Sequence, residues 1–436
     1  MKVTLIKVSM FGDKSHDAIK PLVFAVFDAI TPKDVEMEYI DERIEPLPQT
    51  IDADVIALSV ETFAARRAYD IAGKYKTPSN RIVMGGFHPS AVPEEALAFC
   101  DTVLVGDAED TWPAFLEDCQ NGTPKTTYIS AHKHPLPKLD FNSPAFRGKK
   151  YHPIGLVQFS RGCRYHCDFC SVSSFYAAKV RQKSIETVVE EIRHIKEKIL
   201  FFIDDNLFLD EASALALFEA IKPLKKKWAC QISIDVATND KLLSAMKESG
   251  CMLVMIGFES LSPANLRQMK KAANLRIDTY EKAIRNIYRH RMMIDAMFVL
   301  GYDSDTPASI EETLRFAKKH NFATANFNPL IPMPHTALYA RLRDEGKLIY
   351  EKWWMERGYK YGDTVFCPQG MTAKELQEGC KSARYRFNSI GCILKRLFCN
   401  SIHLSPLRAV VFLLLNLINR KEIHRKQGQV LGGETH

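Results

Sequence analysis

Short apolar runs alternate with longer amphipathic segments along most of the chain. In the first 125 residues, five strand-like runs, at 3–8, 36–40, 55–60, 81–84 and 102–105, alternate with helical stretches at 22–30 and 64–75. Alternation of strands and helices at this period predicts a parallel, doubly wound sheet of the Rossmann type. Ligands of such sheets bind at the carboxyl ends of the strands.

Gly85 and Gly86 follow the fourth of these runs. Two residues without side chains at a strand end let a bulky group approach the backbone. A glycine pair after a strand also occurs in ordinary turns, so the pair alone does not define a site.

The same alternation resumes between residues 151 and 338, where we count six strand–helix repeats. This pattern predicts a partial (β/α)6 barrel of the TIM type, with its chemistry at the carboxyl ends of the strands. Polar residues at those ends are candidates for the site: Asp204, Asp205, Ser233, Asp235, Glu259 and Asp295. Each of them could instead cap the following helix or lie on a solvated rim.

The remaining segments complete the expected domain order. Residues 1–125 form the first domain and 151–338 the barrel, while 126–150, polar and rich in proline, read as a linker. Residues 339–436 are aromatic and then helical, at 373–386, 393–403 and from 406 to 418, which predicts a cap over the barrel. We expect the last dozen residues to be disordered.

The apolar run 410–415 is the most hydrophobic part of this cap. It is much shorter than the roughly 20 residues that span a bilayer, so we expect no transmembrane helix. The pattern favours a core helix. A peripheral membrane contact stays open, because Arg408, Arg420 and Lys421 flank the run.

Composition adds limits on class and compartment. With 436 residues, 46% of them hydrophobic and 25% charged, the chain is typical of a soluble protein of two or three domains. A net charge of +7 is small for this length, and the densest basic runs, 225–227 and 420–426, read as solvated helix ends, so no nucleic-acid partner is expected. Eleven scattered cysteines without a secretory signal indicate a reducing, cytoplasmic location.

Three cysteines stand out from the others. Cys163, Cys167 and Cys170 are spaced C-x3-C-x2-C directly after the strand-like run 154–159. A [4Fe–4S] cluster usually takes four thiolates, so a loop that offers three leaves one iron open, as a catalytic metal site requires. The alternatives are a zinc site, with His166 as a strained fourth ligand, and a loop that happens to be rich in cysteine.

With Arg161-Gly162 before it and Phe169 inside it, this loop resembles the signature of the radical S-adenosylmethionine (radical SAM) enzymes. The resemblance implies a [4Fe–4S] cluster on the three cysteines and reductive cleavage of SAM at the open iron, with electrons from a donor such as flavodoxin or ferredoxin. It places Phe169 near the adenine and Glu259, in the run 256–260, near the SAM ribose. Asp205, within the matching run 202–208, and Ser233 complete the expected SAM residues.

The first domain carries a second resemblance. Runs 58–62, 85–90 and 106–109 are similar to those of the cobalamin-binding-like domain that precedes many radical SAM modules. This implies that Ser59 and Thr62 lie near the nucleotide tail of a cobalamin and that Gly85 and Gly86 lie beside it. The loop that supplies an axial histidine departs from the pattern: residues 13–19 have one extra residue and no glycine.

These resemblances lead to one main hypothesis and two alternatives. The first is a radical SAM enzyme that carries out cobalamin-dependent methyl transfer to an unactivated centre of a small natural-product or lipid-like molecule. The second is a cobalamin-independent enzyme, including one that transfers the 3-amino-3-carboxypropyl group of SAM to arsenic or phosphorus. The third is a non-catalytic iron–sulfur module. No residue is assigned as a catalytic acid or base.

Overall fold

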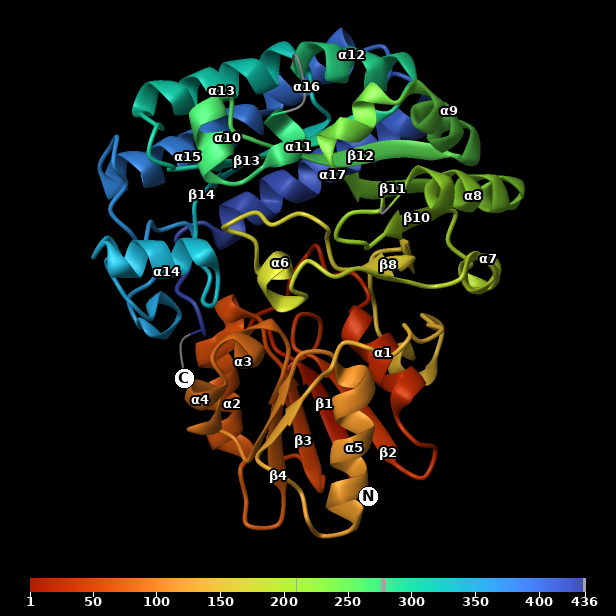
Figure 1. Cartoon of the computed structure of the whole chain (residues 1–436), viewed down its shortest axis with the longest axis vertical. Coiled ribbons are helices and arrows are strands. Elements are labelled where there is room, and N and C mark those ends of the chain that lie inside the picture. Colours follow the sequence, from red (N-terminus) through yellow and green to blue (C-terminus); the bar gives the residue numbers. More distant parts are fainter. Residues whose placement is uncertain (209, 276–279, 434–436) are drawn as a thin grey trace.

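The computed structural model describes residues 1–208, 210–275 and 280–433 and contains two six-stranded sheets stacked along the long axis of the molecule (Figure 1). All strand pairs in both sheets are parallel. The fold is therefore α/β, as the alternation of apolar runs predicts.

The first sheet has the order β2-β1-β3-β4-β5-β6. Its strands are β1 (Lys2–Lys7), β2 (Glu36–Asp41), β3 (Val55–Ser59), β4 (Arg81–Gly85), β5 (Thr102–Val105) and β6 (Thr127–Ile129). Its helices are α1 (Leu22–Ile30), α2 (Ala65–Tyr75), α3 (Phe87–Ala91), α4 (Pro93–Leu97) and α5 (Ala108–Gln120). The strand order reverses between β1 and β3, which is where doubly wound sheets bind ligands.

The sheet extends beyond residue 125. β6 adds to its edge through parallel pairing with β5. Leu139, Phe141 and Phe146 then pack with Trp112 of α5 in the core on the α1 side of the sheet. The segment expected to be a linker is thus partly a sheet edge and partly a cover, which its polar, proline-rich composition did not reveal.

The second sheet has the order β14-β13-β12-β11-β10-β7 and curves into a partial barrel. Its strands are β7 (Gly155–Val157), β10 (Ile199–Phe202), β11 (Lys227–Ile232), β12 (Cys251–Glu259), β13 (Met293–Leu300) and β14 (Thr324–Pro329). The outer helices are α7 (Ile185–His194), α8 (Glu211–Ile221), α9 (Asp240–Ser249), α10 (Pro263–Gln268), α11 (Ala272–Leu275), α12 (Tyr280–Arg289) and α13 (Pro307–Lys319).

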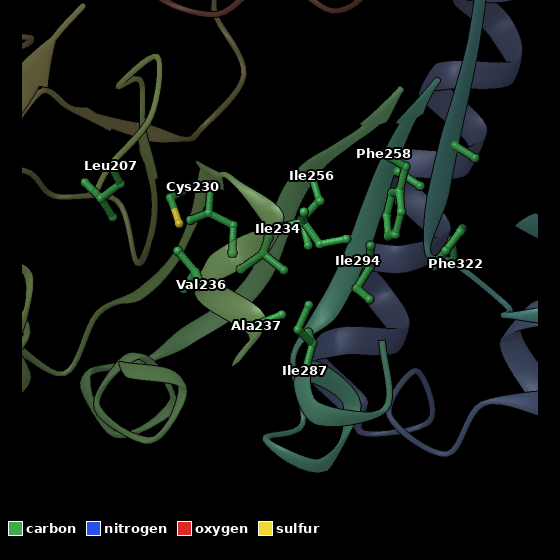
Figure 2. Packing of buried hydrophobic residues seen from close by; sticks show 14 of the residues in the cluster. Leu207, Cys230, Ile234, Val236, Ala237, Ile256, Phe258, Ile287, Ile294 and Phe322 are labelled. Carbon is green, nitrogen blue, oxygen red and sulfur yellow. The ribbon is translucent and has the colours of Figure 1, made fainter. Parts of the chain in front are cut away.

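Alternate residues of these strands point toward the outer helices and form the main core. Figure 2 shows Ile256 and Phe258 of β12 and Ile294 of β13 packed with Ile287 of α12. All four are fully buried. This packing fixes the barrel wall, so the strand ends are held at constant positions around the mouth.

A short hairpin joins the two sheets. It consists of β8 (Ser160–Arg161) and β9 (Arg181–Gln182), with the cysteine loop and α6 (Ser171–Phe175) between them. In Figure 1, α6 lies between the N-terminal sheet and the barrel. The cysteine loop is therefore placed where the carboxyl edges of both sheets face each other.

The last hundred residues contact both parts of the molecule. They contain α14 (Ala337–Asp344), α15 (Ala373–Phe387), α16 (Ile390–Cys399) and α17 (Pro406–Lys426). Trp353 and Trp354 pack on the α2 side of the first sheet, α15 packs on α13 and β14, and α16 and α17 pack on β12 to β14.

The expectation of disorder from residue 425 onward is wrong for 425–433. Val430 pairs with Lys360 in an antiparallel bridge, and Leu431 is 1% exposed in the core beside α2. The polar composition of this segment concealed the single leucine that anchors it. Residues 434–436 lie outside the described part.

Candidate active site

The three predicted cluster ligands lie on one loop between β8 and α6. Cys167 is 8% exposed, and Cys163 and Cys170 are partly exposed. The Cys170 N–H donates to the Cys167 carbonyl at 3.2 Å, which folds the loop back on itself. Three thiols on one compact loop are the donor set that a [4Fe–4S] cluster with an open iron requires.

No group of three metal-binding side chains in the described residues is close enough to share a single ion. A cubane cluster places a different demand on its ligands, because each thiolate binds a different iron. The three thiols therefore need to surround the space that a cluster would fill, and they do not need to converge on one ion.

Segments that follow three of the barrel strands hold the loop in place. The Asp168 N–H donates to Met269 O at 3.2 Å, and the Tyr302 hydroxyl donates to Asp168 Oδ1 at 2.6 Å. The Leu338 N–H donates to the Asp168 carbonyl at 2.9 Å. Met269 is the C-cap of α10, Tyr302 lies just after β13 and Leu338 lies in α14, so one residue inside the cysteine motif ties the loop to the segments after β12, β13 and β14.

Gly162 explains why the motif begins with Arg-Gly. Its φ is +96°, and a Cβ at this position would lie 2.1 Å from the Lys179 carbonyl oxygen. Only glycine adopts this conformation without strain and allows so close an approach. The turn it makes directs the chain from β8 into the loop.

Asp204 and Asp205 follow β10 and have different partners. Asp204 accepts hydrogen bonds from the Phe159 N–H at 3.1 Å and the Ser160 hydroxyl at 2.6 Å. Burial raises its pKa to about 7, and these donors oppose the shift. Asp205 accepts from the Gly162 N–H at 2.8 Å, and burial raises the pKa of its carboxyl as well.

The other residues expected at SAM also lie around the mouth. Ser233 is buried and follows β11, with its hydroxyl 3.5 Å from Asn206 Nδ2. The Phe169 ring meets Tyr302 edge-on at a centroid distance of 6.4 Å. Together with Asp205 and Glu259, these side chains come from the loop and from the ends of β10, β11 and β12.

Glu259 is the most constrained of this group. Its φ is +60°, which is unusual for a residue with a side chain. Its Oε1 accepts a hydrogen bond from Lys271 Nζ at 2.7 Å, and both side chains are largely buried. Although burial favours neutral lysine, the Glu259 carboxylate holds the pKa of Lys271 above its usual value. Lys271 is a cation close to Cys167 and Cys170 that the sequence reasoning did not single out.

An ion-pair network joins the cysteine motif to the first domain. Arg161 Nη1 donates to Asp107 Oδ1 at 3.0 Å and to Glu109 Oε1 at 2.7 Å. Arg181 and His132 also contact Asp107, His132 through Nδ1 at 2.6 Å. Although burial alone would lower it, Glu109 and Asp107 hold the pKa of the Arg161 guanidinium above its usual value.

A cavity of about 440 Å³ opens between the two sheets. Lys7, Ser59, Gly85 and Gly86 line it at the carboxyl edge of the first sheet, and Asp205 lines it on the barrel side. Its deeper part lies between the sheet and α1, with an apolar wall that includes Val26, Phe27, Ala57, Val83 and Leu104. A polar mouth above an apolar slot is suited to a flat ring that carries a polar attachment.

The two glycines contribute differently to this cavity. Gly86 has φ +111°, and a Cβ there would lie 2.7 Å from the Val60 carbonyl oxygen, so the backbone itself requires glycine. A Cβ on Gly85 would meet Leu104 only at 3.5 Å, which is ordinary contact. Gly85 therefore keeps space open in the cavity without being needed for the turn.

Thr62 does not line this cavity. It borders a neighbouring hollow of about 140 Å³, together with His132, Ser174, Phe175 and His335. His16 is exposed in its loop, and no described histidine is among the residues that line the larger cavity. The His16 backbone N–H and the Asp13 side chain are bound by Glu422 and Arg425 of α17.

Comparison with known proteins agrees with this geometry. The model of the radical SAM superfamily matches residues 157–317, which contain the cysteine loop and β10 to β13. Residues 157–317 thus form a radical SAM domain. This domain implies a [4Fe–4S] cluster and SAM as cofactors.

Two relatives extend the similarity over most of the chain. Bacteriochlorophyllide d C-12(1)-methyltransferase of Chlorobaculum tepidum is 28% identical over 418 residues, covering 92% of this chain and 89% of the relative. Hopanoid C-2 methylase of Rhodopseudomonas palustris is 25% identical over 350 residues, covering 76% of this chain and 66% of the relative.

A solved structure shares the arrangement of both sheets. The cobalamin-dependent S-adenosylmethionine radical enzyme OxsB, with aqua-cobalamin and S-adenosylmethionine bound, aligns with a TM-score of 0.65 and 15% identity. The alignment covers 97% of this chain and 72% of that chain. The chain thus shares the fold of that protein, from its Rossmann-like sheet to its partial barrel.

Proposed function

We propose that this radical SAM protein is a cobalamin-dependent methyltransferase that acts on a small natural-product or lipid-like molecule. The observation that carries the proposal is the cavity of about 440 Å³ that runs from Gly86 to Asp205, beside the cysteine loop. A cofactor held in it would face the barrel mouth. Relatives named as methyltransferases of a bacteriochlorophyllide and of a hopanoid support the reaction class and the kind of substrate.

In this proposal the barrel mouth holds the cluster and SAM. Cys163, Cys167 and Cys170 bind three irons, while Phe169, Asp205, Ser233 and Glu259 surround SAM. When bound, these cofactors supply a carbon radical and a methyl group. The chain's own contribution is position: Asp168 and Gly162 fix the loop against the strand exits, and the buried Lys271–Glu259 pair places one charge of each sign beside it.

The first domain would hold cobalamin. Ser59, Gly85 and Gly86 line the mouth of the cavity, and the apolar wall beneath them excludes water from the slot. We retain Thr62 as a contact to the outer part of the cofactor or to the substrate, because its hollow adjoins the same α3–β5 edge. The sheets screen reacting groups from solvent, as radical chemistry demands.

We also propose a cytoplasmic location and a flavodoxin or ferredoxin as electron donor. Cleavage of SAM needs one electron from outside the chain. The cluster loop is partly exposed at Cys163 and Cys170, which supports delivery by a small protein carrier.

The test is anaerobic reconstitution with iron, sulfide and cobalamin, followed by reduction and analysis of SAM products. We expect a cobalamin absorption spectrum that stays with the protein through gel filtration, and 5′-deoxyadenosine together with S-adenosylhomocysteine in the presence of a substrate. A chain that cleaves SAM but retains no cobalamin would overturn the proposal. Methylthioadenosine as the main product would instead indicate aminocarboxypropyl transfer, and no SAM cleavage would indicate a non-catalytic module.

A further inference from the structure

Apolar side chains gather on the outer face of α16 and α17. Of the thirteen large apolar side chains that are well exposed in the described residues, eight lie between residues 390 and 417. Phe398 is 68% exposed and Leu414 is 54% exposed. Isolated exposed leucines are common on soluble proteins, whereas a contiguous group marks an interaction surface.

The spacing of these residues shows that they form one face. Leu407, Val410, Leu414 and Leu417 are exposed along α17 at intervals of three and four residues, which is one side of a helix. Phe412 and Asn416 on its other side are fully buried against the barrel. The helix therefore has a core face and a second apolar face that no described residue covers.

A buried arginine holds this face rigidly. Arg396 of α16 is 1% exposed. Its guanidinium donates to Phe322 O at 2.9 Å, to Ala323 O at 2.7 Å and to Asn416 Oδ1 at 2.9 Å. It thus ties α16 to α17 and to the start of β14, so the exposed apolar face is a fixed part of the fold.

The segment that contains α16 and most of α17 carries charges of one sign only. Residues 379–421 contain eight lysines and arginines and no aspartate or glutamate. Since the whole chain carries a net charge of +7, the rest of it is slightly acidic. Lys395 and Lys421 are exposed on the two helices that carry the apolar face. An apolar face on a segment whose only charged residues are cations complements a surface of anionic headgroups over hydrocarbon.

We propose that the face formed by α16 and α17 docks onto an anionic lipid bilayer. In the described residues, no helix is long and apolar enough to cross a membrane, so α17 would lie in the plane of the interface. A second copy of the chain is a poorer partner, because pairing this face with itself would bring two basic surfaces together. The inference goes beyond the proposed reaction and stands independently of it.

Vesicle flotation with the reconstituted full chain tests this inference. We expect the protein to float with vesicles of phosphatidylcholine and phosphatidylglycerol, to float far less with phosphatidylcholine alone, and to lose binding as salt rises. The double variant Leu414→Glu, Leu417→Glu should lower the bound fraction at least about tenfold. Ile129→Glu is the matched control, because Ile129 is 75% exposed on β6, outside this face, and its loss should leave binding unchanged.

A second pair of variants keeps the test independent of folding. Lys395→Glu with Lys421→Glu changes only exposed charges, and it should weaken binding by about tenfold, while Lys33→Glu on the first domain should not. Cluster iron content reports that each variant is folded. Wild-type protein that stays unbound with both kinds of vesicle overturns the inference. Light scattering that shows a dimer lost in the leucine variant would assign the face to a second copy instead.

Discussion

Arg161 and Asp107 form a buried ion pair that joins the β8–β9 hairpin to the first domain, with Nη1 and Oδ1 3.0 Å apart. Arg161 lies two residues before Cys163, and Asp107 follows β5 at the edge of the cavity. The start of the cysteine motif is thus bonded directly to the domain that we propose to hold cobalamin. This contact links the loop of the proposed cluster to the edge of the proposed cobalamin site.

Arg161→Gln should destabilise the protein strongly. The change leaves Asp107 and Glu109 buried with less positive charge beside them, and breaking a buried pair in this way costs about 3–5 kcal/mol. Arg161→Lys should rescue little, because one ammonium cannot replace a guanidinium that reaches Asp107, Glu109 and Gln158. Denaturant unfolding of the reconstituted protein measures both effects.

Lys138→Ala provides the matched control. Lys138 pairs with Glu190, and both side chains are 52% exposed. Loss of such a surface pair should cost less than about 1 kcal/mol. Equal losses of unfolding free energy for Lys138→Ala and Arg161→Gln would show that the buried Arg161 pair contributes no more to stability than a surface pair.

Cys167→Ala should abolish the cluster. The remaining loop would offer two thiols, too few to hold a cubane. Iron content and the visible absorption of the reconstituted protein should fall to background, and SAM cleavage should stop. Cys367→Ala, at an exposed thiol outside the loop, should keep both. Persistent iron in the Cys167 variant would refute the assignment.

Gly85→Ala and Gly86→Ala should separate folding from cofactor binding. Alanine at 86 must adopt φ near +111° against the Val60 carbonyl, which costs about 1–3 kcal/mol of unfolding free energy. Alanine at 85 meets only ordinary contact and should fold normally, while its methyl group intrudes on the cavity. Cobalamin titration should therefore show weakened binding by Gly85→Ala in a protein of near wild-type stability. Unchanged affinity would place the cofactor elsewhere.

His403 should make the cap sensitive to acid. The residue is fully buried, with Nδ1 2.9 Å from the Arg396 carbonyl, and burial lowers its pKa to about 4. Between about pH 6.5 and pH 4 the unfolded histidine binds a proton that the folded one does not, so stability falls as pH drops through this window. From pH 7.5 to 5.5 this residue should cost about 1.4 kcal/mol.

The readout is the change in unfolding free energy between these two pH values. His403→Asn keeps a donor near Nδ1 but does not titrate, so its loss on acidification should be smaller than that of the wild type by that amount. His16→Asn, at an exposed histidine, should behave as the wild type does. If the His403 variant and the wild type lose the same unfolding free energy between these pH values, protonation of His403 does not cause the acid sensitivity.

The local pattern of apolar and polar residues predicts the order of strands and helices along the chain. Apolar runs of strand length, each ended by a polar residue, placed Asp205, Ser233 and Glu259 around one mouth, because parallel strands bring their carboxyl ends to the same edge. The cysteine spacing, through its resemblance to the radical SAM signature, predicted the cofactors. These signals are local, so a single sequence contains them.

Contacts between distant segments could not be predicted in this way. No spacing rule connects Arg161 with Asp107, 54 residues away, and nothing local marks Lys271 as the partner of Glu259. The apolar run 410–415 read as a core helix, yet Leu414 faces solvent while Phe412 is buried. Only the packing of α17 on the barrel decides which side of an all-apolar helix is covered.

The return of the chain to its starting domain has a mechanical consequence. Arg425 binds Asp13 at 2.8 Å, and the Gly432 N–H donates to Met10 O at 2.7 Å, so the segment after the barrel is fastened to the loop after β1. The barrel is consequently connected to the first domain on both sides, by residues 126–150 before it and by the C-terminal segment after it. Wide hinge opening about residues 126–150 would have to break the second connection, so we expect the molecule to exchange its small molecules through side openings while the two sheets keep their spacing.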